Sequence, residues 1–138
     1  MSFFNTDVEP FDDPLVREAF AYAIDNEDIV GKALAGQGQA ATHFISPVFE
    51  WAQNDDAMIP EADQDRAIEL LEQAGYSTDG SGESLEVTID VFDSGAFLDM
   101  ATVIQDQLSQ IGVSLSINSM EYAAWQEKLI QIVTINLV

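Results

Sequence analysis

Residues 85–119, LEVTIDVFDSGAFLDMATVIQDQLSQIGVSLSINS, decide the fold. Apolar and polar residues alternate over 85–91 and again over 113–117, which is the pattern of a half-buried strand. Between these two segments, apolar residues recur at helical spacing from Phe97 to Ile111, and Gly112 ends the helix. The order strand, helix, strand predicts a β-α-β unit, in which a right-handed crossover joins two parallel strands.

Three further helices are predicted upstream of this unit. Each begins after an aspartate that caps its amino end, and the first also has a proline at its first helical position. Glycines end the second and third helices. The predicted helices run over 14–24 after Asp13, from Asp25 to the glycines at 36 and 38, and from Asp63 or Asp65 to Gly75.

Two segments have a less regular pattern. Residues 36–62 show no periodicity but contain two prolines and the aromatic residues Phe44, Phe49 and Trp51, so we expect a packed surface loop. After the second strand a last helix is predicted to begin near Glu121. The final residues, 130–138, are rich in β-branched side chains and fit a helix or a strand equally well.

The composition sets limits on function. The 138 residues include 25 Asp or Glu and 4 Lys or Arg, which gives a net charge of −21, and 47% are apolar. We expect one folded domain over 1–138 and no binding to nucleic acid or anionic lipid, because a strongly negative field repels both. The longest apolar stretch is about half the roughly 20 residues that span a bilayer, so no membrane span is predicted. Acidic residues spread along the whole chain favour a halophilic protein, and the alternative is an acidic mesophilic domain.

No motif indicates catalysis, a cofactor or a metal. The alternating acids of 61–65 resemble part of a calcium loop, but Arg66 stands where that loop needs glycine. The glycines of 36–41 follow a helix rather than a strand, which argues against a dinucleotide site. His43 is the only histidine, and the chain has no cysteine. We therefore expect no enzyme, and neither a cofactor nor a metal site.

The order of these segments, with particular residues in them, resembles the extracellular solute-binding proteins of peptide-type ABC importers, the family of oligopeptide-, dipeptide- and nickel-binding proteins. The resemblance covers about 3–129 and leaves 130–138 unlike the family. The residues that carry it are Asn5-Thr6, Pro10-Phe11-Asp12-Asp13, Val16-Arg17, Ala23-Ile24-Asp25, Ser46-Pro47, Ala74-Gly75-Tyr76, Ile111-Gly112-Val113 and Glu121-Tyr122. Within the first of these blocks, Arg17 is expected to reach a carboxylate such as that of Asp13.

The resemblance implies an α/β fold, part of one lobe of a periplasmic-binding-protein-like type II fold, and more closely the central part of the C-terminal lobe. It implies capture of peptides or a similar small solute at the extracellular face of the membrane, with the full-length parent protein delivering the solute to an ABC permease. The N-terminus has neither the basic nor the apolar segment of an export signal, so export is expected to depend on that parent.

The same resemblance suggests ligand-binding residues. Tyr122 lies where the family often has an aromatic residue in its cleft, and Ser94 and Phe97 lie in the turn between the first strand and the following helix. The alternatives are core packing for the two aromatic residues and a helix N-cap for Ser94. An alternative function is a stand-alone acidic interaction domain. An isolated lobe is also expected to expose apolar surface through which a homodimer can form.

Overall fold

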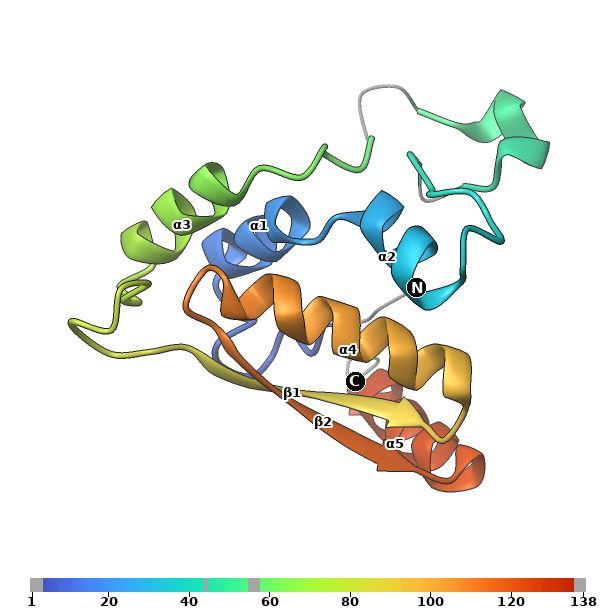
Figure 1. Ribbon diagram of the computed structural model, residues 1–138. Helices are drawn as coiled ribbons and strands as arrows, with labels where there is room; N and C mark the ends of the chain where they lie inside the picture. The colour runs from blue at the N-terminus through green and yellow to red at the C-terminus, as the bar shows by residue number, and fades with distance from the viewer. Residues whose placement is uncertain (1–3, 44, 55–57, 136–138) are drawn as a thin grey trace.

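The computed structural model describes residues 4–43, 45–54 and 58–135, and in these ranges it confirms the predicted α/β class. A short 3-10 helix, labelled η1, lies within the long loop (Figure 1). The helices and strands are, in order, α1 (Pro14–Ala23), α2 (Asn26–Ala33), η1 (Pro47–Ala52), α3 (Gln64–Gln73), β1 (Glu86–Phe92), α4 (Gly95–Ser109), β2 (Ser114–Met120) and α5 (Tyr122–Ile135).

The predicted β-α-β unit is confirmed. Strands β1 and β2 pair in parallel with Glu86 opposite Ser114 and Phe92 opposite Met120, and α4 connects them. Helix α4 covers one face of this two-stranded sheet, and α5 lies against the other (Figure 1). Because side chains alternate along a strand, Val87 and Val91 are buried, whereas Glu86 and Thr88 are exposed.

The hydrophobic core joins the β-α-β unit to the upstream helices. Helix α1 packs against α3, and α2 packs against α4. Small residues such as Ala19 and Ala67, both fully buried, let α1 and α3 approach closely, and Leu71 of α3 is also fully buried in the core. The core is formed by Val16, Ala19, Phe20, Ala23, Ala67, Leu70, Leu71, Leu85, Val87, Leu108, Ile111, Val113 and Leu115.

Aspartate caps begin the three upstream helices, as predicted. The Asp13 carboxylate accepts a hydrogen bond from the Leu15 backbone N–H at 2.8 Å, and Asp25 and Asp63 cap α2 and α3 in the same way. The expected contact between Arg17 and an aspartate carboxylate is wrong. The Arg17 guanidinium instead donates to the backbone carbonyls of Phe11 and Asp12, while Asp13 Oδ1 accepts the Leu15 N–H.

The long loop is less packed than the sequence predicted. Within η1 the side chains of Val48 and Trp51 are 82% and 86% exposed, and Phe49 is also exposed. Phe44 lies outside the described residues. A backbone bridge between His43 and Met58 closes the base of the loop, so that η1 projects away from the helices (Figure 1). We name residues 45–54 the apolar arm.

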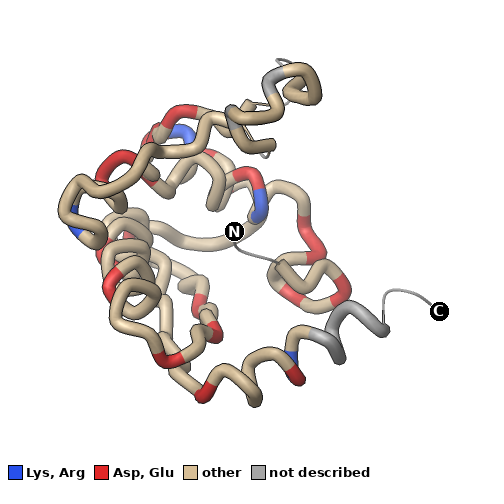
Figure 2. The backbone as a smooth tube through the Cα atoms, turned by 90° about the vertical axis from the view of Figure 1, so that its right-hand side faces the viewer, with Lys and Arg blue, Asp and Glu red and all other residues tan. Residues whose placement is uncertain are grey.

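The C-terminal segment is helical as far as the structure describes it. Helix α5 extends to Ile135, so the helix, rather than the strand, is the outcome over 130–135, and 136–138 lie outside the described residues. None of the helices in the described ranges combines the length and the apolarity needed to cross a bilayer. Figure 2 shows acidic residues along most of the chain and basic residues at only a few places.

Candidate functional site

Four aromatic side chains meet where the two parallel strands end. Phe92 is the last residue of β1, Phe97 lies in the first turn of α4, and Tyr122 and Trp125 lie in the first turn of α5. The Phe92 ring centroid lies 4.4 Å from that of Phe97, 5.3 Å from that of Tyr122 and 5.2 Å from that of Trp125. We name these four residues the aromatic cluster. It occupies the carboxyl edge of the sheet, where ligands bind in open α/β sheets.

The three residues singled out from the sequence all lie at this edge. Phe97 is 41% exposed and Tyr122 is 56% exposed, so neither belongs to the core, which was the alternative for both. Ser94 has the backbone conformation of an N-cap, but its hydroxyl makes no capping hydrogen bond. Its carbonyl instead accepts the N–H groups of Phe97 and Leu98, each at 3.0 Å. The edge therefore presents two accessible rings beside a hydroxyl that the helix does not use for capping.

A polar network around Asp90, which lies two residues before Phe92 on β1, adjoins the aromatic cluster. The Asp90 carboxylate accepts a hydrogen bond from the Asn118 amide at 2.7 Å and forms an ion pair with Lys128 at 2.5 Å. The Asp90 backbone carbonyl accepts a hydrogen bond from the Trp125 indole N–H at 3.2 Å. Asp90 and Asn118 are direct partners in the strand register. Helix α5 is thus attached to the sheet by side chains on both β1 and α5.

Carboxylates flank the aromatic rings. Asp93 directly follows Phe92, Glu121 directly precedes Tyr122, and both acidic residues are exposed. The only lysine that the structure places beside the cluster, Lys128, is paired with Asp90. Aromatic faces carry negative potential, so rings bordered by carboxylates suit an apolar or cationic group better than an anionic one.

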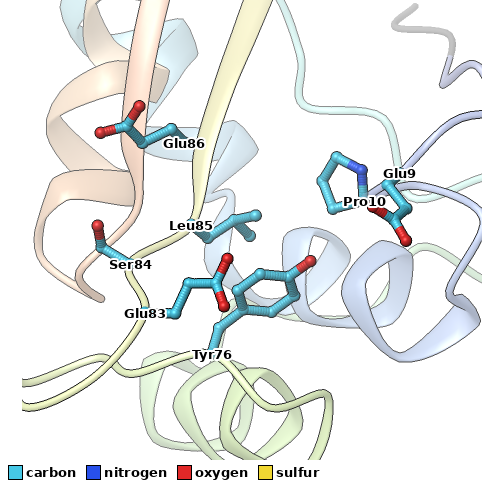
Figure 3. A pocket seen from close by; sticks show the side chains of 7 residues that line it. All are labelled: Glu9, Pro10, Tyr76, Glu83, Ser84, Leu85 and Glu86. Atoms are coloured by element: carbon cyan, nitrogen blue, oxygen red, sulfur yellow. The ribbon is translucent and has the colours of Figure 1, made fainter.

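A hollow of about 370 Å³ lies at the opposite, amino end of β1 (Figure 3). Tyr76, Glu9, Glu83 and Glu86 surround it, with the Tyr76 phenol pointing between Glu9 and Glu83. Burial raises the pKa of the Tyr76 phenol, and the neighbouring carboxylates of Glu9 and Glu83 raise it further. The hollow is open and acidic, and nothing in its geometry indicates a ligand.

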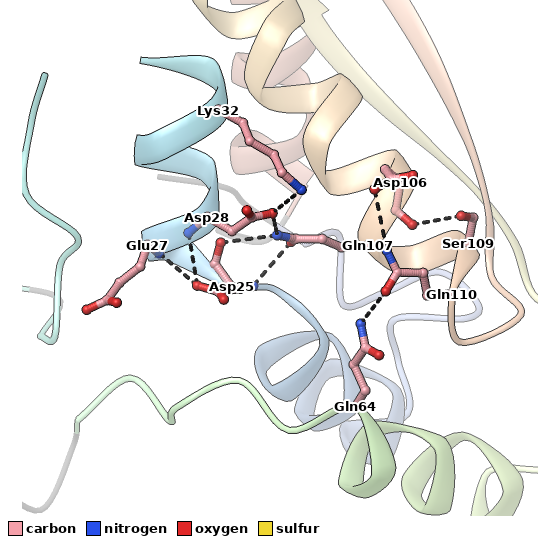
Figure 4. Close-up of polar contacts among 9 residues, drawn as sticks. All are labelled: Asp25, Glu27, Asp28, Lys32, Gln64, Asp106, Gln107, Ser109 and Gln110. Atoms are coloured by element: carbon pink, nitrogen blue, oxygen red, sulfur yellow. Dashed lines mark hydrogen bonds and ion pairs between the residues drawn. The ribbon is translucent and has the colours of Figure 1, made fainter. Parts of the chain in front are cut away.

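A second polar site joins α2 to α4 (Figure 4). The Gln107 side chain is only 4% exposed, and its amide accepts from the Asp25 N–H and donates to the Asp25 carbonyl and the Asp28 carboxylate. Hydrogen bonds from Lys32 and Gln107 lower the pKa of Asp28. Because every polar atom of the Gln107 amide has a partner, this site is a structural connection between helices.

The remaining motifs have structural roles. Asp63 accepts the Arg66 N–H at 3.0 Å and caps α3, as predicted. Gly36 and Gly38 have positive φ in the turn after α2, as expected of a helix end. The His43 Nδ1 atom lies 3.0 Å from the Thr42 hydroxyl. Within the described ranges, no three acidic or histidine side chains are grouped to hold a metal ion.

The sequence analysis missed Phe92, Trp125, Asp90 and Lys128 as members of the candidate site. A signal for them existed, because Phe92 directly follows the strand predicted over 85–91 and lies two residues beyond Asp90, on the same face if the strand continues. Lys128 follows Trp125 by three residues, so both lie on one face of the last helix. The approach of that helix face to Asp90 depends on how α5 folds back onto the sheet, which no local pattern shows.

Comparison with known proteins gives matches over nearly the whole chain. The family model "Bacterial extracellular solute-binding proteins, family 5 Middle" matches residues 1–134. The glutathione-binding protein GsiB of Salmonella typhimurium is 36% identical over 117 residues, which are 85% of this chain and 22% of that protein. The oligopeptide-binding protein AppA of Bacillus subtilis is 30% identical over 131 residues, which are 88% of this chain and 24% of that protein.

Solved structures show the same fold. AppA of Bacillus subtilis in complex with a nonapeptide superimposes with a TM-score of 0.77, at 30% identity over 90% of this chain and 26% of that one. A dipeptide-binding protein from Pseudoalteromonas sp. SM9913 in complex with Met-Leu gives a TM-score of 0.78, at 29% identity over 91% of this chain and 24% of that one. The fold is therefore that of a segment of an extracellular solute-binding protein.

The chain belongs to family 5 of the bacterial extracellular solute-binding proteins, as the resemblance predicted. It spans about a quarter of the length of the relatives it matches.

Proposed function

We propose that this chain is the central part of the C-terminal lobe of a solute-binding protein that captures peptides, or a similar small solute, outside the cell. The parent protein then delivers the solute to an ABC permease, and the chain itself performs no catalysis. Family membership supports this function, and so do relatives whose structures contain a nonapeptide and the dipeptide Met-Leu. The observation that carries the proposal is the exposed aromatic cluster at the carboxyl edge of β1 and β2.

In this proposal Phe97 and Tyr122 contact the side chain or backbone of the solute, and the Ser94 hydroxyl offers it a hydrogen bond. The two rings are accessible, and Phe92 holds them from behind. An apolar or cationic solute group gains dispersion contacts and cation–π attraction from such rings. Asp93 and Glu121 disfavour solutes whose negative charge lies near the rings.

Thermal unfolding in about 2 M KCl with and without Met-Leu tests the proposal, and glutathione serves as a second probe. A ligand that binds only the folded state adds about 2.7 kcal/mol of stability at 100 times its Kd, which raises Tm by several degrees. We expect this shift to vanish in the double variant Phe97→Ser/Tyr122→Ser. The control is Phe49→Ser, which removes a similarly exposed ring from the apolar arm.

The pattern of results distinguishes the possible outcomes. A shift that disappears in the site variant and persists in the control supports the proposed site. An equal shift in all three proteins would place binding elsewhere on the chain. No shift with either probe would overturn the proposal that the aromatic cluster of this chain binds a solute.

A second candidate function is a stand-alone interaction domain that forms homodimers, and the apolar arm is the observation that favours it. Val48, Phe49 and Trp51 expose large apolar surfaces close to one another in sequence, and Val48 and Trp51 are the most exposed of the large apolar residues in the described part of the chain. Each copy carries a charge of −21, so two copies associate only where salt screens their repulsion.

Light scattering after size-exclusion chromatography at about 0.1 M and about 2 M KCl tests self-association. The homodimer predicts a doubled mass at high salt that Val48→Ser/Trp51→Ser reduces to that of the monomer. A monomer under both conditions would overturn this second function and leave the solute-binding proposal untouched.

A further inference from the structure

Asp90 connects three parts of the candidate site. Its carboxylate contacts Asn118 on β2 and Lys128 on α5, while its backbone carbonyl accepts the Trp125 indole N–H. Lys128 and Trp125 are one turn apart on the same face of α5. This one strand residue therefore holds the α5 face that carries half of the aromatic cluster.

Over residues 122–129, whose side chains the structure describes, helix α5 makes few other contacts. It packs against β1, and the contacts that orient its first turns are the rings around Phe92 and the bonds to Asp90. Ala123, Ala124 and Glu127 on the same helix are exposed. A helix attached on one side by a few groups changes its orientation when one of those groups is removed.

The carboxylate is well placed to set that orientation. Asn118 donates to one carboxylate oxygen and Lys128 pairs with the other, so Asn118 fixes the rotamer that directs the charge toward α5. The indole bond ends on the backbone carbonyl, which remains when the side chain is substituted. The Asp90 side chain therefore holds α5 at Lys128, and the Asp90 carbonyl independently holds α5 at Trp125.

We infer that Asp90 is the positioning residue of the aromatic cluster: it sets the orientation of α5, and hence of Tyr122 and Trp125, for solute binding. This inference rests on the proposed function. Asp90 does not touch the solute. Its ion pair keeps α5, in most of the protein molecules, in the orientation in which the aromatic cluster binds the solute.

The test uses a Trp51→Phe background, in which Trp125 is the only tryptophan and its fluorescence reports on α5. In this background Asp90→Ala removes both carboxylate contacts and Lys128→Gln removes the cation. The matched control is Lys32→Gln, which removes a similarly exposed lysine from its ion pair with Asp28, outside the aromatic cluster. We measure acrylamide quenching of Trp125, affinity for Met-Leu, and the urea midpoint of unfolding.

We expect Asp90→Ala and Lys128→Gln to make Trp125 more accessible to acrylamide and to weaken Met-Leu binding about fivefold, with little change in the urea midpoint. A fivefold loss follows if the binding-competent fraction falls to about one fifth, because apparent affinity scales with that fraction. Lys32→Gln leaves all three readouts unchanged. The charge swap Asp90→Lys/Lys128→Asp restores quenching toward the level of the background protein, which a general loss of stability does not predict.

Two results would overturn the inference. One is unchanged Trp125 quenching in Asp90→Ala. The other is a change in quenching and affinity that follows a fall in the urea midpoint and is not rescued by the charge swap, which would make Asp90 a stability residue. If the background protein binds neither Met-Leu nor glutathione, the proposed function fails, but Trp125 quenching and the charge swap still decide whether Asp90 positions α5.

Discussion

Gly112 is the residue at which the structure predicts the sharpest effect of a single methyl group. It joins α4 to β2 with φ of +79°, in the left-handed region. A Cβ atom added there would lie 2.5 Å from the Thr78 carbonyl oxygen and 2.8 Å from the Thr78 Cα atom. These are backbone atoms, so no side-chain rotation relieves the contact. Gly112→Ala therefore forces apart the two turns that precede β1 and β2.

Gly80 provides a matched control for this substitution. Its φ is +78°, and a Cβ atom added there meets nothing within 4 Å. The left-handed conformation costs an alanine about 1–2 kcal/mol at either position. Only Gly112→Ala adds the cost of overpacking, which is about 1–3 kcal/mol in well-packed regions. We expect Gly112→Ala to lower the free energy of unfolding by about 1–3 kcal/mol more than Gly80→Ala does.

Urea unfolding followed by far-UV circular dichroism in about 2 M KCl measures both variants against the parent chain. Equal m-values are required, because they show that the midpoints report stability alone. A difference between the two variants below about 0.5 kcal/mol would refute the reasoning, since it would mean that the contact between Gly112 and Thr78 is not tight in the protein.

Three further predictions follow from the structure. Gln107→Leu leaves the backbone groups of Asp25 without their amide partner and lowers the free energy of unfolding by about 1–3 kcal/mol. The control is Gln110→Leu, which changes an exposed side chain and alters the free energy of unfolding little. Hydrogen bonds from Ser81 and Ser77 lower the pKa of Asp79 to about 2 from a usual value near 3.8. The stabilising contribution of the Asp79 carboxylate is therefore present above pH 4 and is lost as the pH falls toward 2. We expect Asp79→Asn to remove that part of the pH dependence of Tm. Finally, Tm rises with KCl and levels off near 1 M, where the screening length is about 3 Å; an equal rise in sucrose would contradict screening as the cause.

The β-α-β unit and the helix boundaries could be predicted from the sequence because their signals are local. Alternation over 85–91 places every second side chain on one face of the sheet, and the structure buries Val87 and Val91 as that pattern requires. The helix ends at Gly112 because the backbone there is left-handed, a conformation that glycine adopts without strain. Asp25 caps α2 through its own carboxylate, so no tertiary contact is needed to place the start of that helix.

Exposure was harder to predict, because it depends on what the rest of the chain covers. The apolar residues around Trp51 suggest a packed loop, yet the backbone bridge at the base of the arm directs them away from the core. Tyr122 and Phe97 have the spacing of core residues but lie beyond the ends of the strands, where none of the described helices and strands buries them. The role of Asp90 depends on a contact with Lys128, thirty-eight positions further along the chain, which no periodicity detects.

The few basic residues show how acidity and the binding site are related in this chain. All four Lys and Arg side chains have assigned partners: Arg17 binds backbone carbonyls, Lys32 pairs with Asp28, Arg66 with Glu69 and Glu18, and Lys128 with Asp90. Each cation in this protein is therefore held by particular partners, and four cations are too few to balance the 25 acidic residues, which leaves the net charge of −21. Replacing exposed acids changes the response to salt through long-range repulsion, which is distributed over the molecule. Replacing Lys128 instead acts on one helix, the helix that carries Tyr122 and Trp125. The two effects are separable by experiment, because only the second changes the environment of Trp125.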